Sequence, residues 1–323
     1  MISDGISLRA LEVLDELDRT GSIRETAANL GLSASAASQQ LKNLELALGQ
    51  SLVEHGRRPL TLGRGGAAYL AHVRAALTHL RQGASELSLR DLGALRALRL
   101  GVIDDFDSEV TPRLGVALAR MLSAAELTLT TAPSLHILDD LVAREVDLGL
   151  AAGPLELPAD IVETPLLRDP FLLATPRGHL PDPPASLDAL GDLPFLRYEK
   201  GLLQSRQIAS QLARLRLAPP GQIHLDSNQA IFALIANGSG WTISTPVGFF
   251  RARRFHDQVD LHRLPFASFS RTISLLHRPE WMPEIALAIA ESLRGILRTH
   301  VVEPGREAMP WIGDDLSILP RLE

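Results

Sequence analysis

Short polar side chains recur at helical spacing near the N-terminus, where they could contact a nucleic acid. Two short helical patterns between Ser22 and Glu54 meet at Gly31, a residue type that tolerates the left-handed conformation at a helix end. The second pattern carries serine, glutamine and lysine on one face, and these side chains suit phosphates and base edges better than packing. The pattern predicts a helix-turn-helix whose second helix reads DNA. The candidate DNA-contacting residues of this helix are Ser33, Ser35, Ser38, Gln39 and Lys42.

A basic turn follows the second helix. The segment His55–Leu60 lies between the apolar positions Leu52 and Leu62, which is typical of a small β-hairpin, or wing. Arg57 and Arg58 at its tip suit a narrow minor groove, where the negative potential attracts guanidinium groups. The alternative is an ordinary pair of amphipathic helices with a solvated polar face. The basic turn makes this alternative less favoured.

A long helix is expected next. Residues 66–89 lack proline and repeat apolar side chains at alternating spacings of three and four, as a coiled-coil seam does. We expect this helix to join two copies of the chain; a long helix packed on its own chain is the alternative. The predicted dimerisation residues are Leu70, Val73, Leu77, Leu80 and Leu87.

Composition restricts the class of protein. The chain has 323 residues, of which 46% are hydrophobic and 22% charged, as in an ordinary folded protein. It has no apolar stretch near the roughly 18 residues of a membrane span and no export signal, so we expect a cytoplasmic protein without a membrane partner. Cysteine is absent, and the ten histidines show no ligand-like spacing, so neither a metal site nor a cofactor is predicted. The net charge of −6 arises beyond residue 95, since residues 1–95 hold ten basic and ten acidic side chains.

Beyond Asp91 the pattern changes to short apolar runs that alternate with helical stretches. This alternation predicts a mostly parallel sheet with helices on both faces, repeated in two α/β lobes. Extended crossings between the lobes are expected near residues 165–169 and 261–265. A cleft between two linked lobes is a ligand-binding and hinge geometry. The sequence contains no Gly-x-Ser-x-Gly, phosphate-loop or zinc motif, so no catalytic residue is predicted.

The order of these parts resembles the LysR-type transcriptional regulators from Leu8 to about Val301. The resemblance implies an α+β multidomain protein: a winged helix-turn-helix, a long dimerisation helix and a two-lobed sensor like a periplasmic binding protein. It also implies a homodimer or homotetramer, double-stranded DNA and a small effector as partners, and RNA polymerase as a candidate partner. The residues that carry it include Ala27, Ala28, Leu30, Ser33, Ala36, Ser38, Gln40, Leu41, Leu44, Glu45, Leu48, Gly49, Leu52, Arg58, Pro59, Leu60, Leu62 and Gly66.

This resemblance gives the predicted domains. The DNA-binding domain spans residues 1–62 and the dimerisation helix residues 63–90. The effector-binding domain spans residues 91–301, with lobe I at about 96–166 and 265–301 and lobe II at about 167–264. Residues 302–323 are a C-terminal tail with no predicted role.

The resemblance also nominates effector contacts, each with a structural role as its alternative. The acidic run from Asp104 to Asp107 would repel a simple anion, so we expect a cationic, zwitterionic or polar neutral effector. Asp104 or Asp105 would receive its positive group, and Phe106 or Trp241 could add a cation–π contact. In the alternative, these acids cap a helix or face solvent. The nominated residues are Asp104, Asp105, Phe106, Gln204, Ser205, Ser227, Asn228, Trp241 and Thr242.

Two functions from different classes therefore remain. The first is a ligand-responsive transcription factor, and the second is an α/β enzyme with an accessory helical domain. Retention on DNA without turnover would distinguish the first from the second. The identity of the effector, the target genes and the direction of regulation are not encoded in any motif of the chain.

Overall fold

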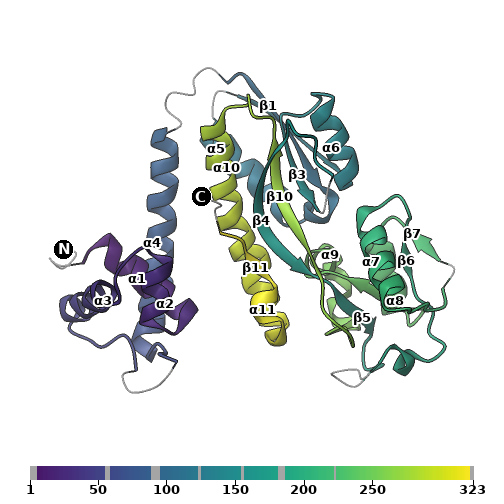
Figure 1. Ribbon diagram of the computed structural model, residues 1–323, viewed down its shortest axis with the longest axis horizontal. Helices are drawn as coiled ribbons and strands as arrows, with labels where there is room; N and C mark the ends of the chain where they lie inside the picture. The colour runs from purple at the N-terminus through teal and green to yellow at the C-terminus, as the bar shows by residue number, and fades with distance from the viewer. Residues whose placement is uncertain are drawn as a thin grey trace. The chain divides into compact units, whose positions relative to one another are not determined.

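The computed structural model describes residues 6–54, 59–88, 95–122, 125–153, 156–180, 186–221 and 223–320. The chain divides into two compact units, Met1–Ser88 and Leu89–Glu323 (Figure 1). The N-terminal unit has one hydrophobic core and the C-terminal unit has two, one in each lobe. The predicted fold class, a helix-turn-helix domain followed by a two-lobed α/β region, is confirmed.

Helix caps fix the elements of the N-terminal unit. The side chains of Ser7, Ser22 and Ser33 each accept a hydrogen bond from the backbone N–H three residues ahead, which starts a helix. Gly21 and Gly49 follow the first and third helices in the left-handed conformation, which ends them. The helices of the described part of this unit are α1 (Leu8–Thr20), α2 (Ile23–Asn29), α3 (Ala34–Leu48) and α4 (Arg64–Ser88).

The long helix α4 packs its apolar residues against its own unit. Leu70, Val73 and Leu77 are only 2%, 3% and 2% exposed, and they share a core with residues of α1 and α3. The prediction that these three residues form an intermolecular seam is therefore wrong, because a spacing of threes and fours fits any helix partner and α1 already covers this face. Leu80 is 56% exposed, and its role stays a prediction. The side chain of Leu87 lies outside the described residues.

Lobe I of the C-terminal unit is built on a mixed sheet with strand order β11-β4-β10-β3-β1-β2. β1, β2 and β3 are parallel, whereas β10 runs antiparallel to β3 and β4. The expected mostly parallel sheet is therefore wrong for lobe I, because the two strands that lead to and from lobe II enter the same sheet in opposite directions. The strands are β1 (Ala97–Ile103), β2 (Glu126–Ala132), β3 (Leu148–Ala152), β4 (Val162–Pro170), β10 (Ser270–His277) and β11 (Ser317–Ile318).

Helices cover this sheet and close the core of lobe I. Helix α6 (Ser134–Val142) packs on β1 and β3, and α10 (Pro283–Leu297) packs on β4 beside α5 (Val110–Met121). Figure 1 shows α10 running along the sheet on the side opposite α6. Because β1 and β3 are buried along most of their length, they read in the sequence as continuous apolar runs.

Lobe II has smaller sheets and a core rich in aromatic residues. A three-stranded antiparallel sheet has the order β8-β5-β9, and β6 pairs with β7 in parallel. The rings of Phe195 and Trp241 stack with centroids 4.6 Å apart in the core. The elements are β5 (Leu172–Pro176), β6 (Arg197–Tyr198), α7 (Leu203–Arg214), β7 (His224–Leu225), α8 (Asn228–Ala236), β8 (Thr242–Ser244), α9 (Pro246–Arg251) and β9 (Val259–His262).

The C-terminal segment is part of lobe I rather than a separate tail. A π-helical turn at Arg298–Val302 leads into α11 (Glu303–Ala308) and then β11, which pairs antiparallel with β4 at the sheet edge (Figure 1). Met309, Ile312 and Leu316 are buried in the core of lobe I. The predicted division at residue 301 therefore cuts through a single packed body.

Candidate functional site

Helix α3 presents a polar face on the helix-turn-helix. Ser33 caps the helix, because its Oγ accepts a hydrogen bond of 3.1 Å from the backbone N–H of Ala36. Ser35, Ser38 and Lys42 are exposed on this helix. The structure places these groups on the helix that the sequence nominates for DNA contact, opposite the core residues of the same helix.

Two further features of this face concern Gln39 and the helix start. The Nε2 of Gln39 donates to the Oδ1 of Asn43 at 2.7 Å, so both exposed amides are held in a fixed orientation on α3. The Oγ atoms of Ser33 and Ser35 lie 3.0 Å apart. Paired amides and hydroxyls of this kind are the groups that contact base edges and phosphates.

The hairpin after α3 is anchored by Glu45, a residue of the family motif to which sequence reasoning assigned no role. Val53 and Leu62 pair as an antiparallel bridge, as the wing prediction requires. The carboxylate of Glu45 accepts hydrogen bonds from the backbone N–H groups of Leu52 and Val53 at 2.8 and 3.3 Å. Gly66 allows the close approach of α4, because a Cβ there would lie 2.0 Å from the carbonyl oxygen of Leu52.

The sequence predicts Arg57 and Arg58 at the tip of this wing. Both lie outside the described residues, so their nomination as DNA contacts stays a prediction.

A buried ion-pair network joins the crossing strands of the C-terminal unit. Arg271 of β10 lies directly opposite Asp169 of β4 in the strand register, and its Nε donates to the Asp169 carboxylate at 2.9 Å. A second nitrogen of Arg271 donates to Asp105 of lobe I at 2.7 Å. The side chains of Arg271, Asp169 and Asp105 are 4%, 0% and 8% exposed, so these charges are almost fully removed from water.

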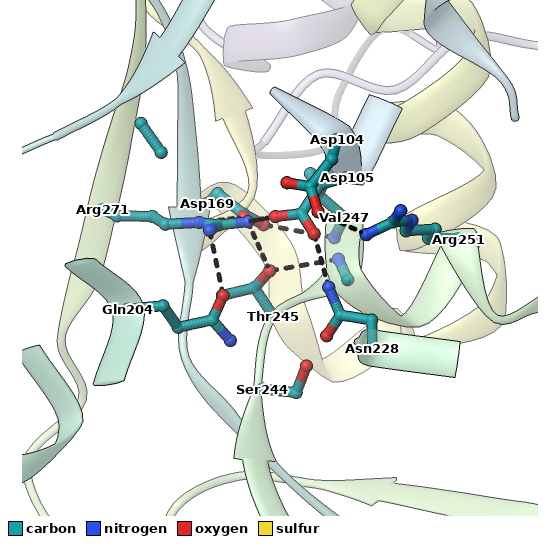
Figure 2. A network of polar contacts seen from close by, with 12 residues as sticks. Asp104, Asp105, Asp169, Gln204, Asn228, Ser244, Thr245, Val247, Arg251 and Arg271 are labelled. Atoms are coloured by element: carbon teal, nitrogen blue, oxygen red, sulfur yellow. Dashed lines mark hydrogen bonds and ion pairs between the residues drawn. The ribbon is translucent and has the colours of Figure 1, made fainter. Parts of the chain in front are cut away.

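The same network extends into lobe II (Figure 2). The Asn228 side chain at the start of α8 donates to Asp105, and its carbonyl accepts from the Tyr198 hydroxyl at 2.6 Å. Arg271 also donates to Gln204 of α7 at 3.1 Å. Burial raises the pKa of Tyr198 well above its ordinary value, so the hydroxyl stays protonated and can donate. Lobe I, the crossing strands and lobe II therefore meet at one cluster of polar side chains.

A second arginine neutralises the acidic run at the end of β1. Arg251 of α9 forms ion pairs with Asp104 at 2.7 Å and with Asp107 at 3.0 Å. Burial and the neighbouring Asp105 carboxylate raise the pKa of Asp104, although Arg251 opposes the shift.

The role predicted for Asp104 and Asp105, receiving the positive group of an effector, therefore needs correction. Both acids are already paired with arginines of the same chain, at residues 251 and 271. These partners are far away in the sequence, which is why the local acidic pattern did not reveal them.

A pocket lies beside this network, between the lobes. Its lining includes Asp104, Asp105, Gln204 and Asn228 from the nominated set, and the hollow of about 480 Å³ includes the open solvent at its mouth. It is also lined by Arg271, Tyr198, Gln207, Asp226 and Ser134, which were not nominated. The nominated segments at the end of β1 and at the starts of α7 and α8 thus meet at one pocket.

Other nominated residues have structural roles. Phe106 is 1% exposed in the core of lobe I, and Trp241 is 2% exposed in the core of lobe II, where its Nε1 donates to the Leu193 carbonyl. Thr242 is fully buried and donates to the Leu196 carbonyl. None of the three is among the residues that line the pocket in the described part of the chain, so the predicted cation–π contact is wrong.

The side chains of two serines of the nominated set form hydrogen bonds with backbone groups. The Oγ of Ser205 donates to the Tyr198 carbonyl at 2.8 Å, and the Oγ of Ser227 caps α8 by accepting from Ala230. Both support the helix starts that line the pocket rather than the pocket itself.

Arg271 and Asp169 were the most important omissions. The sequence signal was weak, because β4 also carries Glu163 and Arg168 and β10 also carries serine, threonine and histidine, so the pattern did not single out these two charged residues. Such residues are rarely buried unless they are paired. Among the described residues there is no cluster of histidine and acidic side chains that could hold a metal ion, and no helix long and apolar enough to cross a membrane.

Comparison with known proteins gives consistent matches along the chain. Residues 8–67 match "Bacterial regulatory helix-turn-helix protein, lysR family", and residues 93–298 match "LysR substrate binding domain". The HTH-type transcriptional regulator CbbR of Rhodospirillum rubrum is 28% identical over 236 residues, which are 72% of this chain and 77% of CbbR. The uncharacterized HTH-type transcriptional regulator YeiE of Escherichia coli K12 is 26% identical over 284 residues, 84% of this chain and 91% of YeiE.

A solved structure shows the same fold. The Corynebacterium glutamicum OxyR C206 mutant superposes with a TM-score of 0.55 and 21% identity, over 94% of this chain and 95% of that one. The two relatives above are named as transcriptional regulators and not as enzymes.

Proposed function

We propose that this chain, which belongs to the LysR family of bacterial regulators, binds promoter DNA through α3 and the wing and changes transcription when a small molecule occupies the pocket between its lobes. The observation that carries the proposal is the exposed polar face of α3 on a capped helix-turn-helix. The neutralised interlobe network beside an open pocket supports the second part. Because its target is chromosomal DNA, the protein acts in the cytoplasm.

The DNA contacts divide into two groups. Ser35, Ser38 and Gln39 face the major groove and choose among base sequences, because hydroxyl and amide groups read base edges. Lys42, together with Ser33 at the helix start, contacts phosphates, and Arg57 and Arg58 contact the groove edge beside the hairpin.

The protein binds DNA as a homodimer, or as a homotetramer of two such dimers. Two exposed parts of α4 support this. One is a face with Ala68, Ala71 and Ala75, and the other is Leu80, which lies on the same side of the helix as Leu77 but is 56% exposed. Small side chains let two helix backbones approach closely, and removing the apolar Leu80 side chain from water is favourable. The alanine face differs from the predicted seam, whereas Leu80 belongs to that seam beyond the part that α1 covers. RNA polymerase is the further partner through which such a dimer acts on transcription.

The test of the proposal is DNA binding by the full chain. The preferred sites are selected from random double-stranded DNA, and affinity is then measured by fluorescence anisotropy at several salt concentrations. Ser38→Ala should change the order of preferred sites, whereas the double variant Arg57→Ala, Arg58→Ala should weaken all sites and lower the salt slope by about one per lost phosphate contact. Leu46→Ala, at an exposed position of the same α3, is the matched control.

Two outcomes would reject this assignment. If the chain shows no salt-dependent binding to any DNA, the regulator function is wrong and the α/β enzyme alternative gains support. If the double arginine variant keeps the full salt slope, the wing has no part in DNA binding.

A further inference from the structure

The orientation of the Gln204 side chain is fixed by its neighbour. An arginine can only donate hydrogen bonds, so the group of Gln204 that faces Arg271 must be the carbonyl oxygen, at 3.1 Å. Figure 2 shows the amide nitrogen turned away from Arg271. This Nε2 is buried and has no hydrogen-bond partner in the described part of the chain, although the Tyr198 hydroxyl lies near it. Gln204 is 8% exposed and lines the pocket.

Gln207 lies one helical turn further on α7 and shows the opposite situation. Its Nε2 donates to the carbonyl of Gly153 at 3.0 Å, and since a carbonyl can only accept, this amide is also fixed. Its Oε1 is buried without a partner among the described residues, and Gln207 also lines the pocket. Beside the pocket, α7 therefore holds one buried unpaired donor and one buried unpaired acceptor, three residues apart. Leaving such groups unpaired when buried is unfavourable, so a ligand that bonds to both gains affinity.

Two helix starts add donors to the same pocket. α7 begins after Leu202 and α6 begins after Pro133, and neither start has a side-chain cap. Residues of both starts line the pocket. Free backbone N–H groups at a helix start bind anionic oxygen atoms such as those of a carboxylate. Together with the Nε2 of Gln204, they form a site for a negatively charged group.

The charges of the pocket disfavour a simple anion. Its lining carries three carboxylates, of Asp104, Asp105 and Asp226, against the single guanidinium of Arg271. Asp104 and Asp105 are paired with arginines, whereas Asp226 is exposed and shows no ion pair among the described residues. A positive group on the ligand would therefore be attracted to Asp226, and its N–H donors could also reach the Oε1 of Gln207.

We infer that the pocket binds a small zwitterion of the amino acid type. Its carboxylate is bound by the Nε2 of Gln204 and the starts of α6 and α7, and its ammonium group by Asp226 and the Oε1 of Gln207. A quaternary ammonium does not fit as well, because it has no N–H to donate to Gln207. This inference rests on the proposed function in taking the pocket as the effector site.

The experiment uses the full chain and the twenty standard L-amino acids as probes. Each is screened by its effect on the melting temperature, and binding is then measured by calorimetry. For every amino acid that binds, the matched acid without the amino group and the matched amine without the carboxylate are measured in parallel. We expect the zwitterion to bind and each half-molecule to bind roughly 10- to 100-fold more weakly, since each lacks one charged hydrogen-bonding group.

Substitutions test which residues hold each group. Asp226→Asn and Gln204→Met should each weaken binding of the amino acid roughly 10- to 100-fold. Gln211→Met is the matched control, because this buried glutamine lies on the same helix but does not line the pocket. The affinity of Gln211→Met for the amino acid should stay within about two-fold of that of the parent chain. Asp226 is exposed, so Asp226→Asn is informative even if the Gln204 variant unfolds.

The possible negative results distinguish failure of this inference from failure of the proposed function. If no amino acid binds, or if plain acids bind as tightly as zwitterions and Asp226→Asn leaves that affinity unchanged, the inference is overturned. DNA binding is measured separately and does not depend on this ligand. A chain that binds DNA but no amino acid thus keeps the proposed function and loses only the ligand class.

Discussion

Removing Arg271 should destabilise the C-terminal unit strongly. In Arg271→Met, the carboxylates of Asp169 and Asp105, 0% and 8% exposed, lose the guanidinium that contacts them at 2.9 and 2.7 Å. Breaking a buried ion pair by deleting one partner typically costs about 3–5 kcal/mol, because the other charge stays buried without compensation. For a body of roughly 150–250 residues this corresponds to a fall in melting temperature of about 6–20 °C.

The assay is thermal unfolding of the full chain followed by circular dichroism, with two comparison variants. Arg168→Met removes an arginine of β4 that is 47% exposed and lies 3.8 Å from Asp315, so it should cost no more than about 1 kcal/mol. The triple variant Arg271→Met, Asp169→Asn, Asp105→Asn removes the stranded charges and should be more stable than Arg271→Met alone.

Lower pH should partly rescue Arg271→Met. Burial raises the pKa of Asp169 even with Arg271 in place, and the guanidinium opposes this shift. Without the guanidinium the folded state binds protons at a higher pH than the unfolded state, so stability rises as pH falls. The stability deficit of the variant should therefore shrink between about pH 8 and about pH 5. If Arg271→Met unfolds no earlier than Arg168→Met, or if its deficit is the same at both pH values, the argument from buried charge is refuted.

Three other perturbations give measurable outcomes. Leu80→Glu should weaken self-association at least roughly 10-fold in sedimentation equilibrium, since Leu80 is a large apolar residue that is exposed in the described part of α4, while Leu8→Glu on α1 should not. Equal dimerisation of both variants would remove α4 from the interface. Lys42→Ala should lower the slope of log affinity against log salt by about one without changing site preference, and an unchanged slope would contradict a phosphate contact. Burial lowers the pKa of His256, whose ring stacks on Phe249 with centroids 3.8 Å apart. The unfolded state therefore takes up the proton first, so the stability of the parent chain should fall relative to His256→Phe as pH drops below about 6.5, and parallel melting curves would contradict this.

Local signals in the sequence were sufficient for the helix-turn-helix. Ser22, Ser33, Gly31 and Gly49 act through hydrogen bonds and backbone conformations within three or four residues, and such short-range effects can be read directly from the chain. The alternation of strands and helices likewise indicated two α/β lobes. These predictions depend on neighbours in sequence and not on which distant segments pack together.

Long-range pairing could not be predicted in the same way. Asp104 and Arg251 are 147 positions apart, and Asp105 and Arg271 are 166 apart, so the acidic run carried no sign of its partners. The same limit applies to Leu70, Val73 and Leu77 of α4. Their spacing predicts an apolar stripe, but the fold decides whether α1 or a second chain covers it.

The edge strand β11 restricts how the C-terminal unit can be cut for experiments. A fragment that ends at residue 298, where the match to the substrate binding domain ends, would remove the fully buried Leu316 and β11, the partner of β4 on its outer edge. The uncovered edge of β4 would then offer unpaired backbone groups to another molecule, which favours aggregation. Recombinant fragments of this unit should therefore extend through residue 320, and a poorly soluble shorter fragment would reflect this open edge rather than an unstable lobe.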